Sequence, residues 1–274
     1  MAYQLKRLAG YALGFILFYA PFALFQGIIG YLLTGKWQEL SIHSLCLRIP
    51  IEHLLDGKIW NYNPISVIST IVLLVTAFFL GPVFCGRLCP AGAFTEYLSK
   101  LVPSKYQIEW SKHTEITPLR YGMLAGYCMV PFFGSILACA YCNFFIFDLL
   151  VRYYIWGYFI SLSSSLILTA LVWLIVLGIF TKGGRGFCNF FCPVGAVQNF
   201  VHYFSNKLPF VWRMQVDKDK CVGCTRCQKY CPMEAIQVKN NKAQLSLHNC
   251  IACGQCAHYC PVKAITYGGK QHEK

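Results

Sequence analysis

The stretch that decides the fold is Cys221-Val-Gly-Cys224-Thr-Arg-Cys227-Gln-Lys-Tyr-Cys231-Pro232, and it returns 29 residues later as Cys250-Ile-Ala-Cys253-Gly-Gln-Cys256-Ala-His-Tyr-Cys260-Pro261. Each run has three closely spaced cysteines and a fourth before proline, the spacing of two-cluster iron–sulfur sites in which the fourth cysteine binds the other cluster. We therefore predict two [4Fe–4S] clusters bound crosswise, one by Cys221, Cys224, Cys227 and Cys260 and the other by Cys250, Cys253, Cys256 and Cys231. A zinc ribbon or a disulfide scaffold fits poorly, because zinc sites pair two Cys-x-x-Cys units and seldom add a Cys-Pro after three residues.

The amino-acid composition is typical of a protein that lies in a lipid bilayer. The chain has 274 residues, of which 56% are hydrophobic, and its mean hydropathy is +0.47, which is high for a soluble domain. Four charge-poor stretches, 8–33, 64–84, 121–145 and 161–181, are each longer than the roughly 20 residues that a transmembrane helix needs. The first lacks a signal-peptide cleavage site and is read as retained. The predicted fold class is an α-helical integral membrane protein with four transmembrane helices and a C-terminal two-cluster ferredoxin-like α+β domain.

The charges set the predicted orientation. Lys and Arg crowd the segments before the first stretch, between the second and third, and after the fourth, which places these segments in the cytoplasm. We expect a multi-pass protein of the bacterial inner membrane with a cytoplasmic N-terminus and a cytoplasmic ferredoxin domain. This topology explains most of the net charge of +13, so nucleic-acid binding is not required, whereas anionic lipid and acidic redox partners are favoured. Sixteen cysteines on a mainly reducing face indicate cluster ligands.

A second motif is also repeated. Cys85-Gly-Arg-Leu-Cys89-Pro recurs 103 residues later as Cys188-Asn-Phe-Phe-Cys192-Pro. The repeat predicts a duplicated two-helix unit, with copies at about 8–105 and 119–209. The domains are then a membrane domain, 1–213, and a ferredoxin domain, 214–274. Since both copies run in the same direction, a pseudo-twofold axis along the membrane normal should bring the two motifs together.

These four cysteines suit an anionic site. Proline favours the first turn of a helix, so Cys89 and Cys192 are expected beside helix N-termini, where the helix dipole stabilises a thiolate. Cys85, Cys89, Cys188 and Cys192 would supply enough ligands for a third iron–sulfur cluster shared between the copies. The alternative is that they pack as small buried residues against the C-terminal domain.

The other cysteines carry less information. Cys46, Cys139 and Cys142 together could bind a metal, form a redox-active disulfide at the outer face, or do neither. Cys128 stands alone and is read as a small hydrophobic residue.

Three further residues, His43, His53 and Trp60, lie between the first and second apolar stretches, on the predicted outer side of the membrane. They would line a quinone pocket or act as interfacial anchors. A haem is not expected, because no predicted span contains a histidine.

The paired Cys-x-x-x-Cys-Pro motifs, the four spans and the two-cluster tail resemble the NapH-type quinol dehydrogenase membrane subunits. The NosR core and the cytochrome oxidase assembly ferredoxin resemble the same pattern, but we expect neither the flavin-binding domain of the first nor the β-sandwich of the second within these 274 residues. The resemblance implies electron transfer between quinone and a partner, with Cys85, Cys89, Cys188 and Cys192 as the signature. Cys46, Cys139 and Cys142 are not part of that pattern.

Three functions follow from these motifs. The first is an electron-transfer subunit, related to quinol dehydrogenases, that moves electrons between quinone and a protein redox partner or other subunits of a complex. The second is an assembly or maturation factor that reduces a metal or thiol at the outer face. The third is a redox sensor, for which the sequence has no signalling or DNA-binding module. The direction of electron flow stays open, because cluster potentials vary widely with their surroundings.

Overall fold

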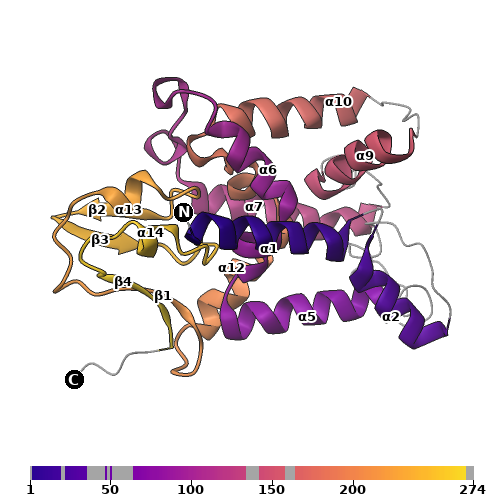
Figure 1. Cartoon of the computed structure of the whole chain (residues 1–274), viewed down its shortest axis with the longest axis horizontal. Helices are drawn as coiled ribbons and strands as arrows, with labels where there is room; N and C mark the ends of the chain where they lie inside the picture. The colour runs from indigo at the N-terminus through magenta and orange to yellow at the C-terminus, as the bar shows by residue number, and fades with distance from the viewer. Residues whose placement is uncertain are drawn as a thin grey trace.

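The computed structural model describes residues 2–19, 22–35, 47, 50, 64–133, 142–157 and 164–269, and Figure 1 shows the arrangement of their helices and strands. The helical part is built from α1 (Ala2–Phe18), α2 (Leu24–Thr34), α5 (Pro64–Leu80), α6 (Pro90–Ser99), α7 (Ile116–Met129), α9 (Asn143–Trp156), α10 (Ser164–Leu171), α11 (Gly186–Phe190) and α12 (Pro193–Ser205). Two π-helical segments, Phe84–Leu88 and Val172–Ile179, interrupt it.

The prediction of four transmembrane helices is wrong. Among the helices that the structure describes, none is both long enough and apolar enough to cross a membrane. The longest described helices, α1 and α5, have 17 residues each. The predicted inner-membrane location, with the N-terminus and the C-terminal domain in the cytoplasm, depended on these spans and is corrected with them.

Each of the four apolar stretches is interrupted. In the first, α1 ends at Phe18 and α2 begins only after Ala23, which has the left-handed φ of 41°. In the second, α5 ends before Gly81, whose φ is 71°. The third breaks where α7 gives way to a 3₁₀ turn at Val130, and the fourth changes from α10 to the π-helical segment after Leu171. Hydropathy measures apolar content and does not locate these breaks.

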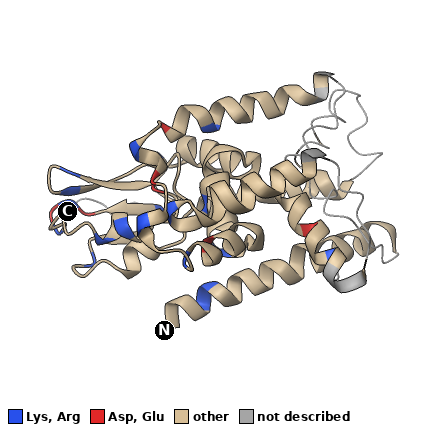
Figure 2. Ribbon diagram, turned by 90° about the horizontal axis from the view of Figure 1, so that it is seen from above, with Lys and Arg blue, Asp and Glu red and all other residues tan. Residues whose placement is uncertain are grey.

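The C-terminal part is a small unit of strands and short helices. It contains β1 (Arg213–Val216), α13 (Arg226–Lys229), β2 (Ile236–Lys239), β3 (Lys242–Leu245), α14 (Gln255–His258) and β4 (Ile265–Gly268). β1 pairs with β4 and β2 pairs with β3, both antiparallel. Lys and Arg mark many of its strands and loops (Figure 2). This unit lies at one end of the helical part in Figure 1.

Close backbone contact joins the two parts. Gly86 lies so near the second cysteine run that an added Cβ would be 2.0 Å from the carbonyl oxygen of Ile251. The Asn189 side chain donates a hydrogen bond to the Met233 carbonyl, 3.2 Å away. At the N-terminus, the Tyr3 hydroxyl donates to the Cys253 carbonyl at 2.5 Å. The helical part is therefore held directly against the cysteine-bearing loops.

Candidate iron–sulfur centres

Eight cysteines of the C-terminal part surround two small cavities. The first cavity is lined by Cys221, Cys224, Cys227 and Cys260. The second is lined by Cys231, Cys250, Cys253 and Cys256. In each cavity, three cysteines of one run meet the cysteine before proline of the other run. The remaining walls are apolar, with Val238 and Ile265 in the first and Met214 and Ile251 in the second.

The two runs have nearly the same local structure. The amide of Ala235 donates to Cys231 Sγ and the amide of Ala264 donates to Cys260 Sγ, both at 3.3 Å. The residues just before these alanines, Glu234 and Lys263, both have a φ of 50°. Such N–H···S hydrogen bonds stabilise negative charge on sulfur. The cavities therefore fit [4Fe–4S] clusters by donor set, by apolar enclosure and by the backbone groups directed at sulfur.

The two Cys-x-x-x-Cys-Pro motifs also share one local structure. Cys89 precedes α6 with φ and ψ of −73° and 106°, and Cys192 precedes α12 with −72° and 110°. Each of these cysteines donates its amide to the carbonyl five residues earlier, at 2.9 Å for Phe84 and 3.1 Å for Phe187. Both helices begin with proline at the first position, as the sequence predicts.

Glycines interlock the two motifs. Gly92, in the first turn of α6, lies against the motif that contains Cys188, and an added Cβ at this glycine would be 3.4 Å from Cys188 Sγ. Gly195, one turn into α12, is placed in the same way, with its added Cβ 3.8 Å from Cys85 Sγ. All four motif cysteines, Cys85, Cys89, Cys188 and Cys192, are buried, and they lie near enough to affect one another's pKa; they are called here the four-cysteine group.

Burial makes ionisation of this group costly. It raises the pKa of Cys85 to about 12, and the neighbouring Cys188 raises it further, against the opposing effect of Arg120 and Arg185. The pKa of Cys192 is also raised by burial and by the nearby sulfurs. Four adjacent thiolates would therefore need positive charge from bound iron in addition to the two arginines.

Arg120 is the unusual member of this site. Its side chain is 1% exposed, and its Nη2 donates to Asn199 Oδ1 at 2.9 Å. Its Nε and Nη1 have no hydrogen-bond partner among the described residues. The guanidinium lies against the four-cysteine group, because an added Cβ on Gly195 would be 2.8 Å from Nη2 and 3.8 Å from Cys85 Sγ. A buried cation with two unused donors fits an anion in this place.

Arg185 is fully paired, and it belongs to a network around Glu96. The Glu96 carboxylate accepts hydrogen bonds from Arg7 at 2.8 and 3.0 Å, from Arg185 at 2.7 Å and from Gln255 at 2.7 Å. Arg185 also donates to the Cys85 carbonyl at 2.8 Å. Burial alone would raise the pKa of Glu96, but Arg185 and Arg7 hold it below its ordinary value. Sequence spacing does not predict this network, because its residues lie far apart in the chain.

The structure shows no site formed by the other predicted residues, most of which lie outside the part of the chain that it describes. Cys46, Cys139, His43, His53 and Trp60 lie outside the described residues. Cys142 is described and precedes α9. Within the described part of the chain, no group of three or more Cys, His, Asp or Glu side chains lies close enough to hold one metal ion, and this includes the cysteines of both cavities and of the four-cysteine group.

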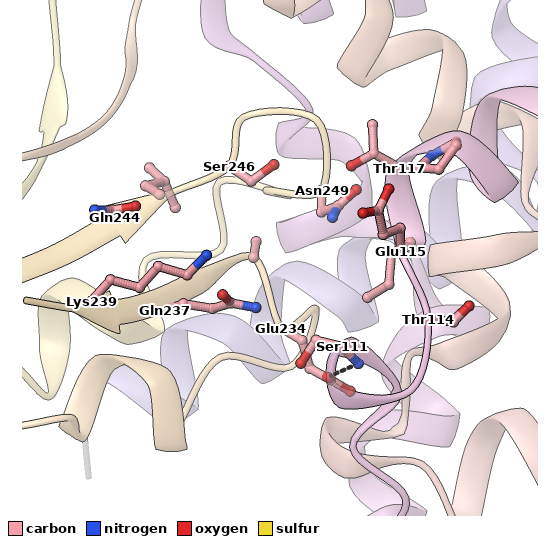
Figure 3. Close-up of a pocket in the computed structure, with 14 residues that line it drawn as sticks. Ser111, Thr114, Glu115, Thr117, Glu234, Gln237, Lys239, Gln244, Ser246 and Asn249 are labelled. Carbon is pink, nitrogen blue, oxygen red and sulfur yellow. Dashed lines mark hydrogen bonds between the residues drawn. The ribbon is translucent and has the colours of Figure 1, made fainter.

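A larger polar pocket separates the loop before α7 from β2 and β3 (Figure 3). The Glu234 carboxylate lies at its edge and accepts hydrogen bonds from the amides of Ser111 at 2.8 Å and Trp110 at 3.2 Å. None of the predicted cysteine ligands lines this pocket. The hydrogen bonds of Glu234 join the loop before α7 to the C-terminal part.

Comparison with known families agrees with the cysteine chemistry. The family model of a 4Fe–4S binding domain matches residues 62–109 and 166–210, and each match contains one Cys-x-x-x-Cys-Pro motif. The model of a 4Fe–4S dicluster domain matches residues 213–267. The chain is therefore a protein with 4Fe–4S ferredoxin-type domains.

Particular relatives are distant. An uncharacterized protein of Methanocaldococcus jannaschii is 29% identical over 204 residues, which cover 71% of this chain and 76% of the relative. A second uncharacterized protein of that organism is 27% identical over 169 residues, covering 62% and 58%. The Escherichia coli protein YccM, whose name provisionally assigns it to electron transport, is 23% identical over 184 residues, covering 65% and 49%. No solved structure matches the chain.

Proposed function

We propose that the chain is an iron–sulfur electron-transfer protein whose C-terminal part holds two [4Fe–4S] clusters crosswise. The observation that carries this proposal is the composition of the two cavities, each lined by three cysteines of one run and the fourth of the other. A bound [4Fe–4S] cluster would supply a one-electron carrier. The likeness to YccM supports electron transport as the purpose of these clusters.

The protein's own residues have distinct roles in this proposal. The cysteines bind iron, the amides of Ala235 and Ala264 stabilise charge on sulfur, and apolar side chains such as Met214 and Ile251 limit access of water.

The crosswise assignment is tested by single substitutions in anaerobically purified protein. Cys231→Ser should remove the electron paramagnetic resonance signal of the cluster held by Cys250, Cys253 and Cys256. Cys260→Ser should remove the other signal, and Cys128→Ser, in α7, is the matched control that should change neither. If each substitution instead damages only the cluster of its own run, the crosswise arrangement is refuted.

The four-cysteine group is proposed to hold a third cluster shared between the two copies of the repeat. The interlocked glycines and the unused Arg120 donors support this, because they leave buried thiols beside a cation for which the described residues supply no anionic partner. The division into a duplicated part, with copies at about 8–105 and 119–209, and a cluster-binding part from 214 onward stays part of this proposal. The paired motifs also support kinship with the NapH-type proteins.

Quinol is the electron donor that the NapH resemblance suggests, and a direct assay tests it. The purified protein with its clusters is mixed anaerobically with a short-chain menaquinol or ubiquinol, and cluster bleaching is followed in the visible range. Bleaching that depends on quinol concentration would support a quinone substrate, whereas bleaching by a reduced carrier protein alone would exclude these quinols.

A further inference from the structure

The two cavities of the C-terminal part differ in their access to solvent. In the first cavity, the lining residue Cys224 is exposed, and Val222 and Val262 are 63% and 37% exposed. In the second, Cys231, Cys250 and Cys256 are all buried. The first site is therefore the more exposed of the two, since part of its own lining reaches the surface.

The second cavity faces the helical part. Gly86 contacts the backbone of Ile251 and Cys253, and Asn199 donates to the carbonyl of Cys250 at 2.7 Å. The same Asn199 accepts from Arg120 beside the four-cysteine group. The three sites thus lie in the order first cavity, second cavity, four-cysteine group, and the first cavity forms the exposed end.

Positive charge surrounds that exposed end. Lys220, Arg226, Lys242 and Lys263 each adjoin in sequence a residue that lines the first cavity, and Lys242 Nζ donates to the Cys221 carbonyl at 3.0 Å. Residues 213–269 contain eight Lys and Arg but three Asp and Glu. One of these acids, Glu234, is turned to the loop before α7, and a second, Asp217, pairs with Lys220.

Three exposed cations define the surface. Arg226, Lys229 and Lys263 are exposed, and no ion pair joins them to an acid among the described residues. We group them with Val222 and Val262, the two exposed apolar residues that line the first cavity, and call these five residues the basic tip. Small interfaces of this kind, steered by charge, are typical of transient redox partners.

We propose that the basic tip is the docking surface for an acidic one-electron carrier protein. This inference rests on the proposed function, because it requires a cluster in the first cavity. One electron passes between the carrier and that site, so that one partner is oxidised as the other is reduced, without bond formation or proton transfer. The occupant is acidic, because Arg226, Lys229 and Lys263 are exposed cations that no described acid neutralises by an ion pair.

The test follows reduction of the purified protein with its clusters by stopped-flow absorbance, with a dithionite-reduced acidic plant-type [2Fe–2S] ferredoxin as the probe. At low ionic strength, the second-order rate constant should fall at least tenfold in the triple variant Arg226→Glu, Lys229→Glu, Lys263→Glu. Added salt should slow the wild type more than the variant. Lys105→Glu is the matched control, since Lys105 is an exposed lysine on a separate turn, and it should leave the rate unchanged.

Iron content and the spectra of the reduced clusters are measured for all three proteins. If the wild type lacks the C-terminal clusters, the proposed function fails. If the clusters are present but the rate is independent of salt, and the triple variant reacts like the wild type, the docking surface is refuted while the proposed function stands.

Discussion

Glu96→Gln should be among the most destabilising single substitutions in the helical part. The carboxylate is 1% exposed and neutralises Arg7 and Arg185, which are 4% and 1% exposed. Removing its charge leaves two buried guanidinium groups without a counter-ion, and breaking a buried ion pair in this way costs about 3–5 kcal/mol. We expect the free energy of unfolding to fall by that amount.

The assay is anaerobic urea unfolding at pH 7, followed by tryptophan fluorescence. Glu109→Gln is the matched control, because Glu109 pairs with Lys182 nearer the surface, where an ion pair contributes about 0–1 kcal/mol. Adding Arg7→Met to Glu96→Gln should recover part of the loss, since one unpaired cation is removed. A loss below about 1 kcal/mol in Glu96→Gln, or no recovery in the double variant, would refute the reasoning.

The pH dependence of this contribution has a definite sign. Because the pKa of Glu96 is lowered in the folded protein, its stabilising effect is present above the ordinary carboxyl pKa of 4.5. It is lost as the pH falls below that value through the folded pKa. Wild-type stability should therefore decline below pH 4.5 more steeply than that of Glu96→Gln.

Three further substitutions test other parts of the structure. Gly86→Ala should disturb the cluster in the second cavity, because its Cβ would clash with the Ile251 carbonyl at 2.0 Å, and an unchanged cluster spectrum would contradict the close contact. Burial lowers the pKa of His202 to about 4, so between pH 6.5 and pH 4 this side chain is neutral in the folded protein and protonated in the unfolded chain. The free energy of unfolding should therefore fall by about 1.4 kcal/mol for each pH unit from 6.5 toward 4. If the free energy of unfolding of His202→Asn falls equally steeply over this range, the prediction is refuted. Arg120→Gln should lose the signal assigned to the four-cysteine group while the other two signals persist; retention of all three would exclude a role for Arg120.

The sequence predicted local chemistry better than it predicted architecture. The cysteine spacings predict two sets of four ligands, and each set lines one cavity of the structure; that the sets bind clusters stays a prediction. The long elements were predicted wrongly. Apolar content suggested four spans, but the helices end at positions such as Ala23 and Gly81, and apolar side chains such as Leu32, 77% exposed, remain on the surface of short helices.

The contacts that organise the site could not be read from sequence spacing. Arg120 lies 79 residues from Asn199, and Glu96 lies 89 residues from Arg185, so only the fold shows that they meet. The excess of Lys and Arg in the sequence suggests a membrane topology, whereas the structure places four of these residues next in sequence to residues that line the exposed cysteine cavity.

The central claim is that the chain carries three iron–sulfur sites, one of them shared by both copies of the Cys-x-x-x-Cys-Pro motif. The most direct measurement is iron and acid-labile sulfide per chain, with electron paramagnetic resonance spectra, in anaerobically purified wild type, Cys85→Ser and Cys188→Ser. Three [4Fe–4S] sites give about twelve iron atoms in the wild type. Either variant should lose the same spectral component together with about four of these irons, so that about eight remain. About eight irons in the wild type, with unchanged spectra in both variants, would contradict this claim.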